Sequence, residues 1–121
     1  MLIDKLGEAK YAELKKDVSE FLLELVKIRS YSNEELEACE YAYKKFSEIN
    51  GVEVRKVFMN NGLKNNPLWC CGPLENNDYT GHFNIEVIWR GTGEQDPFFV
   101  NAHIDTVFAS EGDERLLHPH I

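Results

Sequence analysis

The stretch FFVNAHIDTV, residues 98–107, is the most informative part of this sequence. It opens with apolar residues and closes with His103 and Asp105. Apolar residues that follow one another without alternation are typical of a strand covered on both faces, so we predict a buried strand at about 97–102. The two polar residues then follow its carboxyl end, which is where open α/β sheets bind their ligands.

His103 and Asp105 are two positions apart, and side chains at that spacing in an extended chain point to the same side. A carboxylate that accepts the proton on imidazole Nδ1 fixes the tautomer and leaves Nε2 available. That arrangement suits either a metal ligand or a general base. A histidine that only completes a surface hydrogen bond gives the same motif, so the motif alone leaves all three interpretations open.

Two helices are predicted before this strand. Apolar residues recur every three or four positions between residues 8 and 28, which indicates a helix at about 5–29. A second stripe of the same spacing indicates a helix at about 33–49. Ser32 and Glu35 have the spacing of a capping box, in which each side chain satisfies a free backbone N–H at the start of a helix.

Two further strands complete the predicted fold. β-branched residues in partial alternation indicate a strand at about 52–59, and a clear alternation indicates another at about 82–90. A turn that contains glycine joins the latter to the strand at 97–102, so we expect a hairpin there. The fold class is α/β, with two N-terminal helices packed on a partial mixed sheet within one domain, residues 1–121.

Composition narrows the possible partners. The chain has 121 residues, 43% hydrophobic and 28% charged, as is ordinary for a globular domain. Its net charge of -8 argues against nucleic acid. It contains neither a stretch that could span a membrane nor the apolar core of a signal peptide, so we expect a cytoplasmic protein.

The chain has an odd number of cysteines, Cys39, Cys70 and Cys71, and two of them are adjacent. This is not the pattern of a disulfide framework, so we expect reduced thiols.

The chain resembles zinc-dependent exopeptidases and deacylases, the family of carboxypeptidase G, aminoacylase, acetylornithine deacetylase and succinyl-diaminopimelate desuccinylase. The resemblance covers nearly all of the chain. It rests on the helix segment FLLELVKIRS at 21–30, on Ser32, on GVEV at 51–54 and on NAHIDTV at 101–107. The family commonly has glycine before the histidine, where this chain has Ala102.

The resemblance implies a role for each residue of the motif. His103 would bind one metal of a two-metal centre, and Asp105 would be a catalytic residue that holds the imidazole in position. The metal would be zinc, with cobalt or manganese as alternatives. The substrate would be a small peptide or an N-acyl amino acid, and the domain would have the α/β/α architecture of the family.

Motifs that the family carries later in its chain are missing from these 121 residues, including a bridging carboxylate and a Glu-Glu pair. A catalytic zinc normally has three protein ligands. We therefore expect an N-terminal part of a catalytic domain that is inactive alone. His118 and His120, with the acidic residues at 111–114, could supply substitute ligands. The alternative is a non-catalytic relative that acts as a binding or self-association module, which could form a homo-oligomer.

Overall fold

The computed structural model describes residues 2–68, 78–94 and 96–107. The described residues divide into two compact units, one that ends at residue 28 and one that begins at residue 29. The described helices and strands follow in the order α1, α2, α3, β1, η1 and β2. The described residues thus form helices and a small antiparallel sheet. This confirms that the chain mixes α and β structure.

The described part of the first unit consists of α1 (Leu2–Leu6) and α2 (Glu8–Lys27). The prediction of a single helix at 5–29 is therefore wrong at its start, because Gly7 separates two helices. Gly7 has φ 77, a left-handed conformation that glycine adopts without a steric penalty. The α2 helix ends at Ile28, whose backbone is extended. None of the residues of α2 is buried, and Val18 is 56% exposed.

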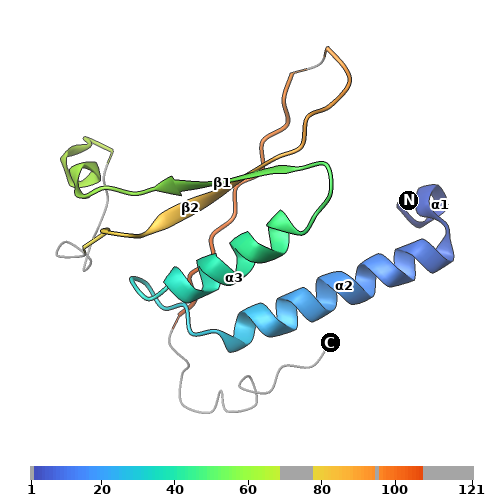
Figure 1. The fold of residues 1–121 in the computed structure, drawn as a ribbon, viewed down its shortest axis with the longest axis horizontal. Coiled ribbons are helices and arrows are strands. Elements are labelled where there is room, and N and C mark those ends of the chain that lie inside the picture. The colour runs from blue at the N-terminus through green and yellow to red at the C-terminus, as the bar shows by residue number, and fades with distance from the viewer. Residues whose placement is uncertain (1, 69–77, 95, 108–121) are drawn as a thin grey trace. The chain divides into compact units, whose positions relative to one another are not determined.

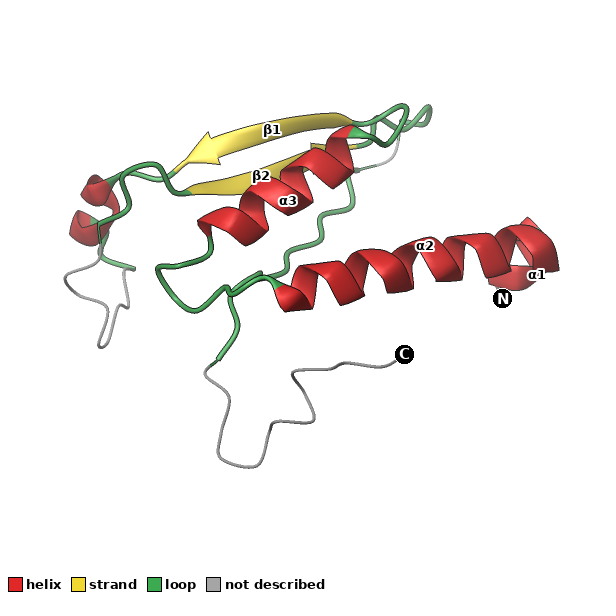
Figure 2. Cartoon of the chain, turned by 60° about the horizontal axis from the view of Figure 1, so that its bottom comes forward, coloured by secondary structure: helices red, strands yellow, loops and turns green. Residues whose placement is uncertain are grey.

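The second unit contains α3 (Leu36–Ser47), β1 (Glu53–Phe58), a short 3₁₀ helix η1 (Asn61–Asn65) and β2 (Phe83–Ile88). The two strands pair antiparallel, with Glu53 opposite Ile88 and Phe58 opposite Phe83. Helix α3 lies along one face of this two-stranded sheet (Figures 1 and 2). The second unit is therefore a helix packed on a β ribbon.

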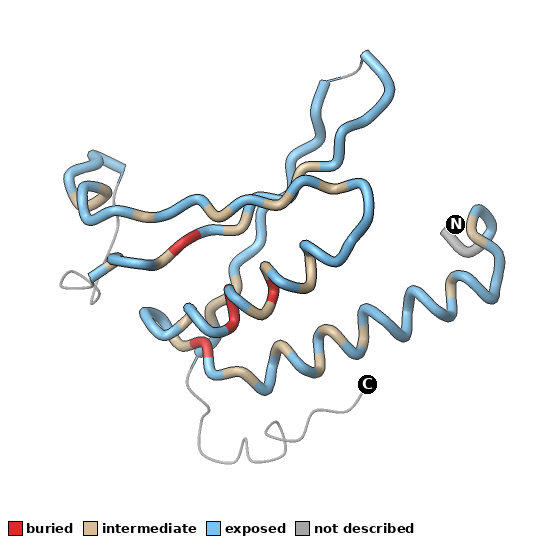
Figure 3. Tube along the Cα trace, viewed as in Figure 1, coloured by how far each residue is buried: buried red, intermediate tan, exposed pale blue. Residues whose placement is uncertain are grey.

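The core of the second unit lies between α3 and β2. Ala38, Cys39 and Ala42 face inward from the helix, and Phe83 is only 4% exposed (Figure 3). The Phe83 ring makes an edge contact with Tyr43 of the helix, with ring centroids 6.4 Å apart. Small helix residues permit this close approach of an aromatic ring. Burial raises the pKa of the Cys39 thiol, and the nearby carboxylates of Glu35 and Glu40 raise it further.

The other face of the ribbon carries a group of charged side chains. Arg55 Nε donates to Glu53 Oε1 at 2.7 Å, and Arg90 donates to Glu53 Oε2 at 3.0 Å. Hydrogen bonds from Arg55 and Arg90 lower the pKa of Glu53. Glu86 opposes Arg55 in the ladder and pairs with it. Because successive strand residues point to opposite faces, Glu53, Arg55 and Glu86 lie on the face opposite Phe83.

The predicted strand at 97–102 does not form, and this expectation is wrong. Residues 96–105 have no regular secondary structure, and Phe98, Phe99 and Val100 are 92%, 84% and 72% exposed. The predicted hairpin is wrong as well, because β2 pairs with β1. An apolar run becomes a strand only where a neighbour pairs with its backbone, and the described residues place no strand beside this one. Trp89, which lies within the stretch 82–90 predicted as a strand, is 83% exposed.

The second predicted helix is shorter than expected, because α3 begins at Leu36 rather than at about 33 and ends at Ser47 rather than 49. Asn33 has φ 74, so the chain makes a turn before the helix.

Neither α2 nor any shorter helix in the described part of the chain has the length and apolar character of a membrane span.

Candidate functional site

The structure brings His103 and Asp105 together as the motif predicts. His103 Nδ1 lies 3.0 Å from Asp105 Oδ1 and 3.0 Å from the backbone oxygen of Asp105. Both residues belong to a segment without regular secondary structure that leads to Thr106. Their contact is local, because only one residue separates them in the chain.

The two oxygens around His103 Nδ1 determine which ring nitrogen carries the proton. A carboxylate oxygen and a backbone carbonyl oxygen can only accept hydrogen bonds, so Nδ1 is the donor in both contacts. In the neutral ring the lone pair is then on Nε2. Nε2 has no hydrogen-bond partner among the described residues, and the His103 side chain is 83% exposed. The imidazole thus presents an oriented lone pair to its surroundings.

A second segment, far away in sequence, holds the motif in place. Tyr31 and Thr106 form an isolated parallel β-bridge. The Thr106 amide donates to the Ser30 carbonyl at 2.8 Å, and the two hydroxyls lie 3.3 Å apart. Ser30 is 2% exposed, so its hydroxyl depends on this protein partner rather than on water. The bridge fixes the backbone immediately after Asp105.

Ser32 connects this second segment to the His103–Asp105 pair. Its hydroxyl donates to Asp105 Oδ2 at 3.3 Å. The capping box predicted for Ser32 and Glu35 is therefore wrong: α3 has Glu35 at its N-cap and no side-chain cap, and the Glu35 carboxylate accepts from the Asn33 amide at 2.7 Å. The Ser32 hydroxyl instead bonds to a residue 73 positions away in sequence, a contact that no local spacing reveals.

The turn around Ser32 is stabilised by its own contacts. The Glu34 amide donates to the Tyr31 carbonyl at 2.7 Å, and Asn33 occupies the left-handed region. Arg29 forms an ion pair with Glu34 and places its guanidinium 4.8 Å from the centre of the Tyr31 ring. Asparagine tolerates a positive φ better than most residues. Residues 29–34 therefore present the Ser32 hydroxyl from a locally ordered turn.

The chemistry of His103 fits one ligand of a metal centre. Zinc, cobalt and manganese all accept imidazole nitrogen, and a metal-bound histidine normally donates its other ring N–H to a carboxylate or carbonyl, as His103 does to both. Within residues 2–68, 78–94 and 96–107, no three histidine, cysteine, aspartate or glutamate residues converge in a way that could hold a metal ion. The described site thus supplies one oriented ligand.

The other histidine in the described ranges has a structural position. His82 precedes β2, and its carbonyl accepts from the Met59 amide at 2.8 Å. Its Nδ1 lies 3.7 Å from Glu35 Oε2, and its side chain is 18% exposed. His82 is thus mostly covered and lies immediately before the start of β2. His118, His120, the acidic residues at 111–114, Cys70 and Cys71 lie outside the described residues.

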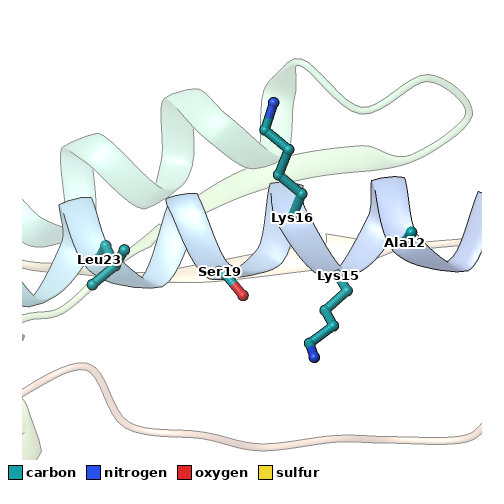
Figure 4. A pocket seen from close by; sticks show the side chains of 5 residues that line it. All are labelled: Ala12, Lys15, Lys16, Ser19 and Leu23. Carbon is teal, nitrogen blue, oxygen red and sulfur yellow. The ribbon is translucent and has the colours of Figure 1, made fainter. Parts of the chain in front are cut away.

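A surface pocket occurs in the first unit, on one side of α2 (Figure 4). It is lined by Ala12, Lys15, Lys16, Ser19 and Leu23. The side chains of Lys15 and Lys16 point away from each other, so the two ammonium groups do not converge on one point (Figure 4). The pocket contains none of the residues of the His103 site.

Comparison of the chain with protein-family models, with curated proteins and with solved structures found no match.

Proposed function

We propose that this chain carries one metal ligand of a metal-dependent hydrolase that cleaves amide or peptide bonds, as an exopeptidase or an N-deacylase. His103 binds the metal through Nε2, and Asp105 is the catalytic-site carboxylate that orients it. The observation that carries the proposal is the 3.0 Å contact between His103 Nδ1 and Asp105 Oδ1, with Nε2 exposed and unengaged by described groups. The resemblance of NAHIDTV to the zinc exopeptidase family adds to it.

A metal in such a centre polarises the amide carbonyl and lowers the pKa of a bound water. The contribution of this chain is to present the ligand. Asp105 keeps the proton on Nδ1 of His103, so that Nε2 stays available. A preoriented ligand also loses less side-chain entropy when it binds.

Three protein ligands are usual at a catalytic zinc, and the described residues supply one. We therefore propose that these residues belong to the amino-terminal part of a catalytic domain. The other ligands and the general base come from sequence outside the described ranges, and the 121 residues have no hydrolase activity by themselves. Zinc is the proposed metal, with cobalt and manganese as alternatives, and the substrate is a small peptide or an N-acyl amino acid.

Metal binding by His103 can be tested directly on the chain. Co²⁺ is added to isotope-labelled protein that carries His118→Ala and His120→Ala, and the broadening of NMR signals is mapped. We expect broadening that is centred on His103 and is abolished by His103→Ala. His82→Ala is the matched control and leaves the pattern unchanged. Broadening centred elsewhere, or unaffected by His103→Ala, would contradict the assignment.

Activity is tested in a protein that includes this chain and the later motifs that the resemblance implies, with dipeptides and N-acyl amino acids as substrates. We expect Asp105→Ala to lower activity by roughly 10- to 100-fold, the usual cost of losing a carboxylate that orients a metal ligand. His103→Ala should lower it further, and His82→Ala should have little effect. Full turnover in the His103→Ala protein would refute the proposed function.

A second candidate function is a non-catalytic binding or self-association module. The observation that favours it is the exposure of the apolar residues Phe98, Phe99 and Val100, which are 92%, 84% and 72% exposed. Contiguous exposed apolar surface is typical of interaction sites. Sedimentation analysis of the chain would then show concentration-dependent association that Phe99→Ser weakens, whereas a monomer at all concentrations would exclude this candidate.

A further inference from the structure

We infer that Ser32 is a positioning residue for Asp105: its hydroxyl holds one carboxylate oxygen so that the other remains on His103. The chemical consequence of this inference rests on the proposed function, while its geometry can be tested without any metal or substrate. The inference assigns a role within the site to a residue that is distant from the motif in sequence.

The two oxygens of Asp105 have different partners. Oδ1 lies 3.0 Å from His103 Nδ1, and Oδ2 accepts from the Ser32 hydroxyl at 3.3 Å. The Asp105 side chain is 43% exposed, so water can compete for both oxygens. A carboxylate held by one hydrogen bond can exchange between staggered rotamers, whereas contacts at both oxygens select one rotamer and one orientation of the carboxylate plane.

Ser32 reaches Asp105 because two backbone features align the segments. The hydrogen bond from the Thr106 amide to the Ser30 carbonyl, 2.8 Å long, brings residues 30–32 alongside residues 105–106. The left-handed Asn33 then turns the chain toward α3. Ser32 is thus placed between a β-bridge and a turn, and both restrict the position of its Cβ.

The usual alternative role for a serine before a helix does not apply here. A capping serine accepts from a backbone amide in the first helical turn. The N-cap of α3 is Glu35, and the helix has no side-chain cap. The contact with Asp105 is the one hydrogen bond that the Ser32 hydroxyl makes among the described residues. Ser32 is exposed, so water can solvate its hydroxyl, and the contact is not needed to satisfy a buried group.

Loss of the Ser32 hydroxyl therefore has a specific expected effect. The Asp105 carboxylate would sample more than one rotamer, while the backbone bridge between Ser30 and Thr106 stays. The His103 ring would keep its contact with the Asp105 carbonyl oxygen, at 3.0 Å, and so would keep its tautomer. The effect is confined to the orientation of the Asp105 carboxylate.

The test measures the three-bond couplings from the backbone nitrogen and carbonyl carbon of Asp105 to its Cγ, in the 121-residue chain. We expect values typical of one staggered rotamer in the parent and averaged values in Ser32→Ala. Ser32→Thr keeps the hydroxyl and should restore the single rotamer. Ser47→Ala removes a hydroxyl that bonds to the Tyr43 carbonyl within α3, and it should leave the Asp105 couplings as in the parent.

Amide chemical shifts of β1, β2 and α3 confirm that each variant keeps the fold. A single Asp105 rotamer in folded Ser32→Ala overturns the inference, whatever Co²⁺ does at His103. Full turnover of the larger protein with His103→Ala overturns the proposed function, whatever the Asp105 couplings show. The two measurements thus separate the role of Ser32 from the role of the metal.

Discussion

The Ser30 hydroxyl lies 3.3 Å from the Thr106 hydroxyl, although 76 positions separate the two residues in sequence. Ser30 is 2% exposed, and the bridge between Tyr31 and Thr106 lies beside this contact. The pair joins the residues that precede α3 to the residues that follow His103. The geometry of the candidate site therefore depends on a tertiary contact as well as on the local motif.

A double-mutant cycle measures this contact. Thr106→Val leaves the buried Ser30 hydroxyl without its partner, so we expect it to lower the free energy of unfolding by about 1–3 kcal/mol. Ser30→Ala removes the hydroxyl that Thr106→Val leaves without a partner. The double variant should therefore lose less free energy of unfolding than the two single variants lose together, by roughly 0.5–1.5 kcal/mol. Urea unfolding followed by circular dichroism gives these values. Strict additivity would mean that the two hydroxyls do not interact.

Asn33 is expected to tolerate glycine but not alanine. Its φ of 74 lies in the left-handed region, where a Cβ costs roughly 1–2 kcal/mol unless the side chain compensates. Asn33→Ala should therefore lower the free energy of unfolding by about 1 kcal/mol, and Asn33→Gly should change it little. Asn50→Ala is the matched control and should stay within about 0.5 kcal/mol of the parent. Equal stability of the alanine and glycine variants at 33 would contradict the turn geometry.

Lys56 is expected to stabilise the contact between β1 and α3. Its ammonium lies 4.4 Å from the Phe83 ring centre and 4.7 Å from that of Tyr43, and it forms an ion pair with Glu40. The Lys56 side chain is 24% exposed, so these interactions are less screened than surface pairs. Lys56→Met keeps the apolar stem and removes the charge, and we expect it to cost about 1–2 kcal/mol in chemical unfolding.

Lys45→Met is the control for the Lys56 prediction. Lys45 pairs with Glu48 one helical turn away, in a contact that is largely exposed. Because water screens an exposed pair of this kind, we expect Lys45→Met to lower the free energy of unfolding less than Lys56→Met does. If the two lysine variants lose the same free energy, the aromatic contacts of Lys56 do not contribute.

Asp78 should titrate well below an ordinary aspartate. Hydrogen bonds from the side-chain amide of Asn61 and from Thr80 lower the pKa of Asp78 to about 2, against 3.8 for the free group. Because the folded-state pKa is depressed, the stability that Asp78 contributes is present above pH 3.8 and is lost as pH falls through about 2. NMR titration of the carboxyl carbon measures the midpoint.

The Asn61 contact makes the largest contribution to the low pKa of Asp78. Asn61→Ala should therefore raise the midpoint toward 3.8, and Asp78→Asn should remove this part of the acid sensitivity. A parent midpoint close to 3.8 would show that the Asn61 and Thr80 contacts are not maintained in solution.

Much of the secondary structure could be predicted from local patterns. The α2 and α3 helices fall within the predicted ranges because an apolar stripe with a period near 3.6 specifies a helix. The strands β1 and β2 were found by their alternation. The break at Gly7 and the late start of α3 were missed, since periodicity does not show where one glycine or one asparagine takes a positive φ.

Strand pairing was beyond the local pattern. The apolar run at 98–100 was expected to form a buried strand, yet β1 is the partner of β2, and the run is exposed. Hydrophobicity favours burial but does not specify a partner, and pairing needs a second backbone at hydrogen-bond distance.

The candidate site divides in the same way between sequence and structure. The contact between His103 and Asp105 could be predicted from the motif, because the two residues are only two positions apart. The contacts of Ser32 with Asp105 and of Ser30 with Thr106 could not be predicted, and they become visible only in the folded chain. Residues that are near neighbours in sequence stay close in almost any fold, whereas contacts across more than 70 positions depend on how the whole backbone packs.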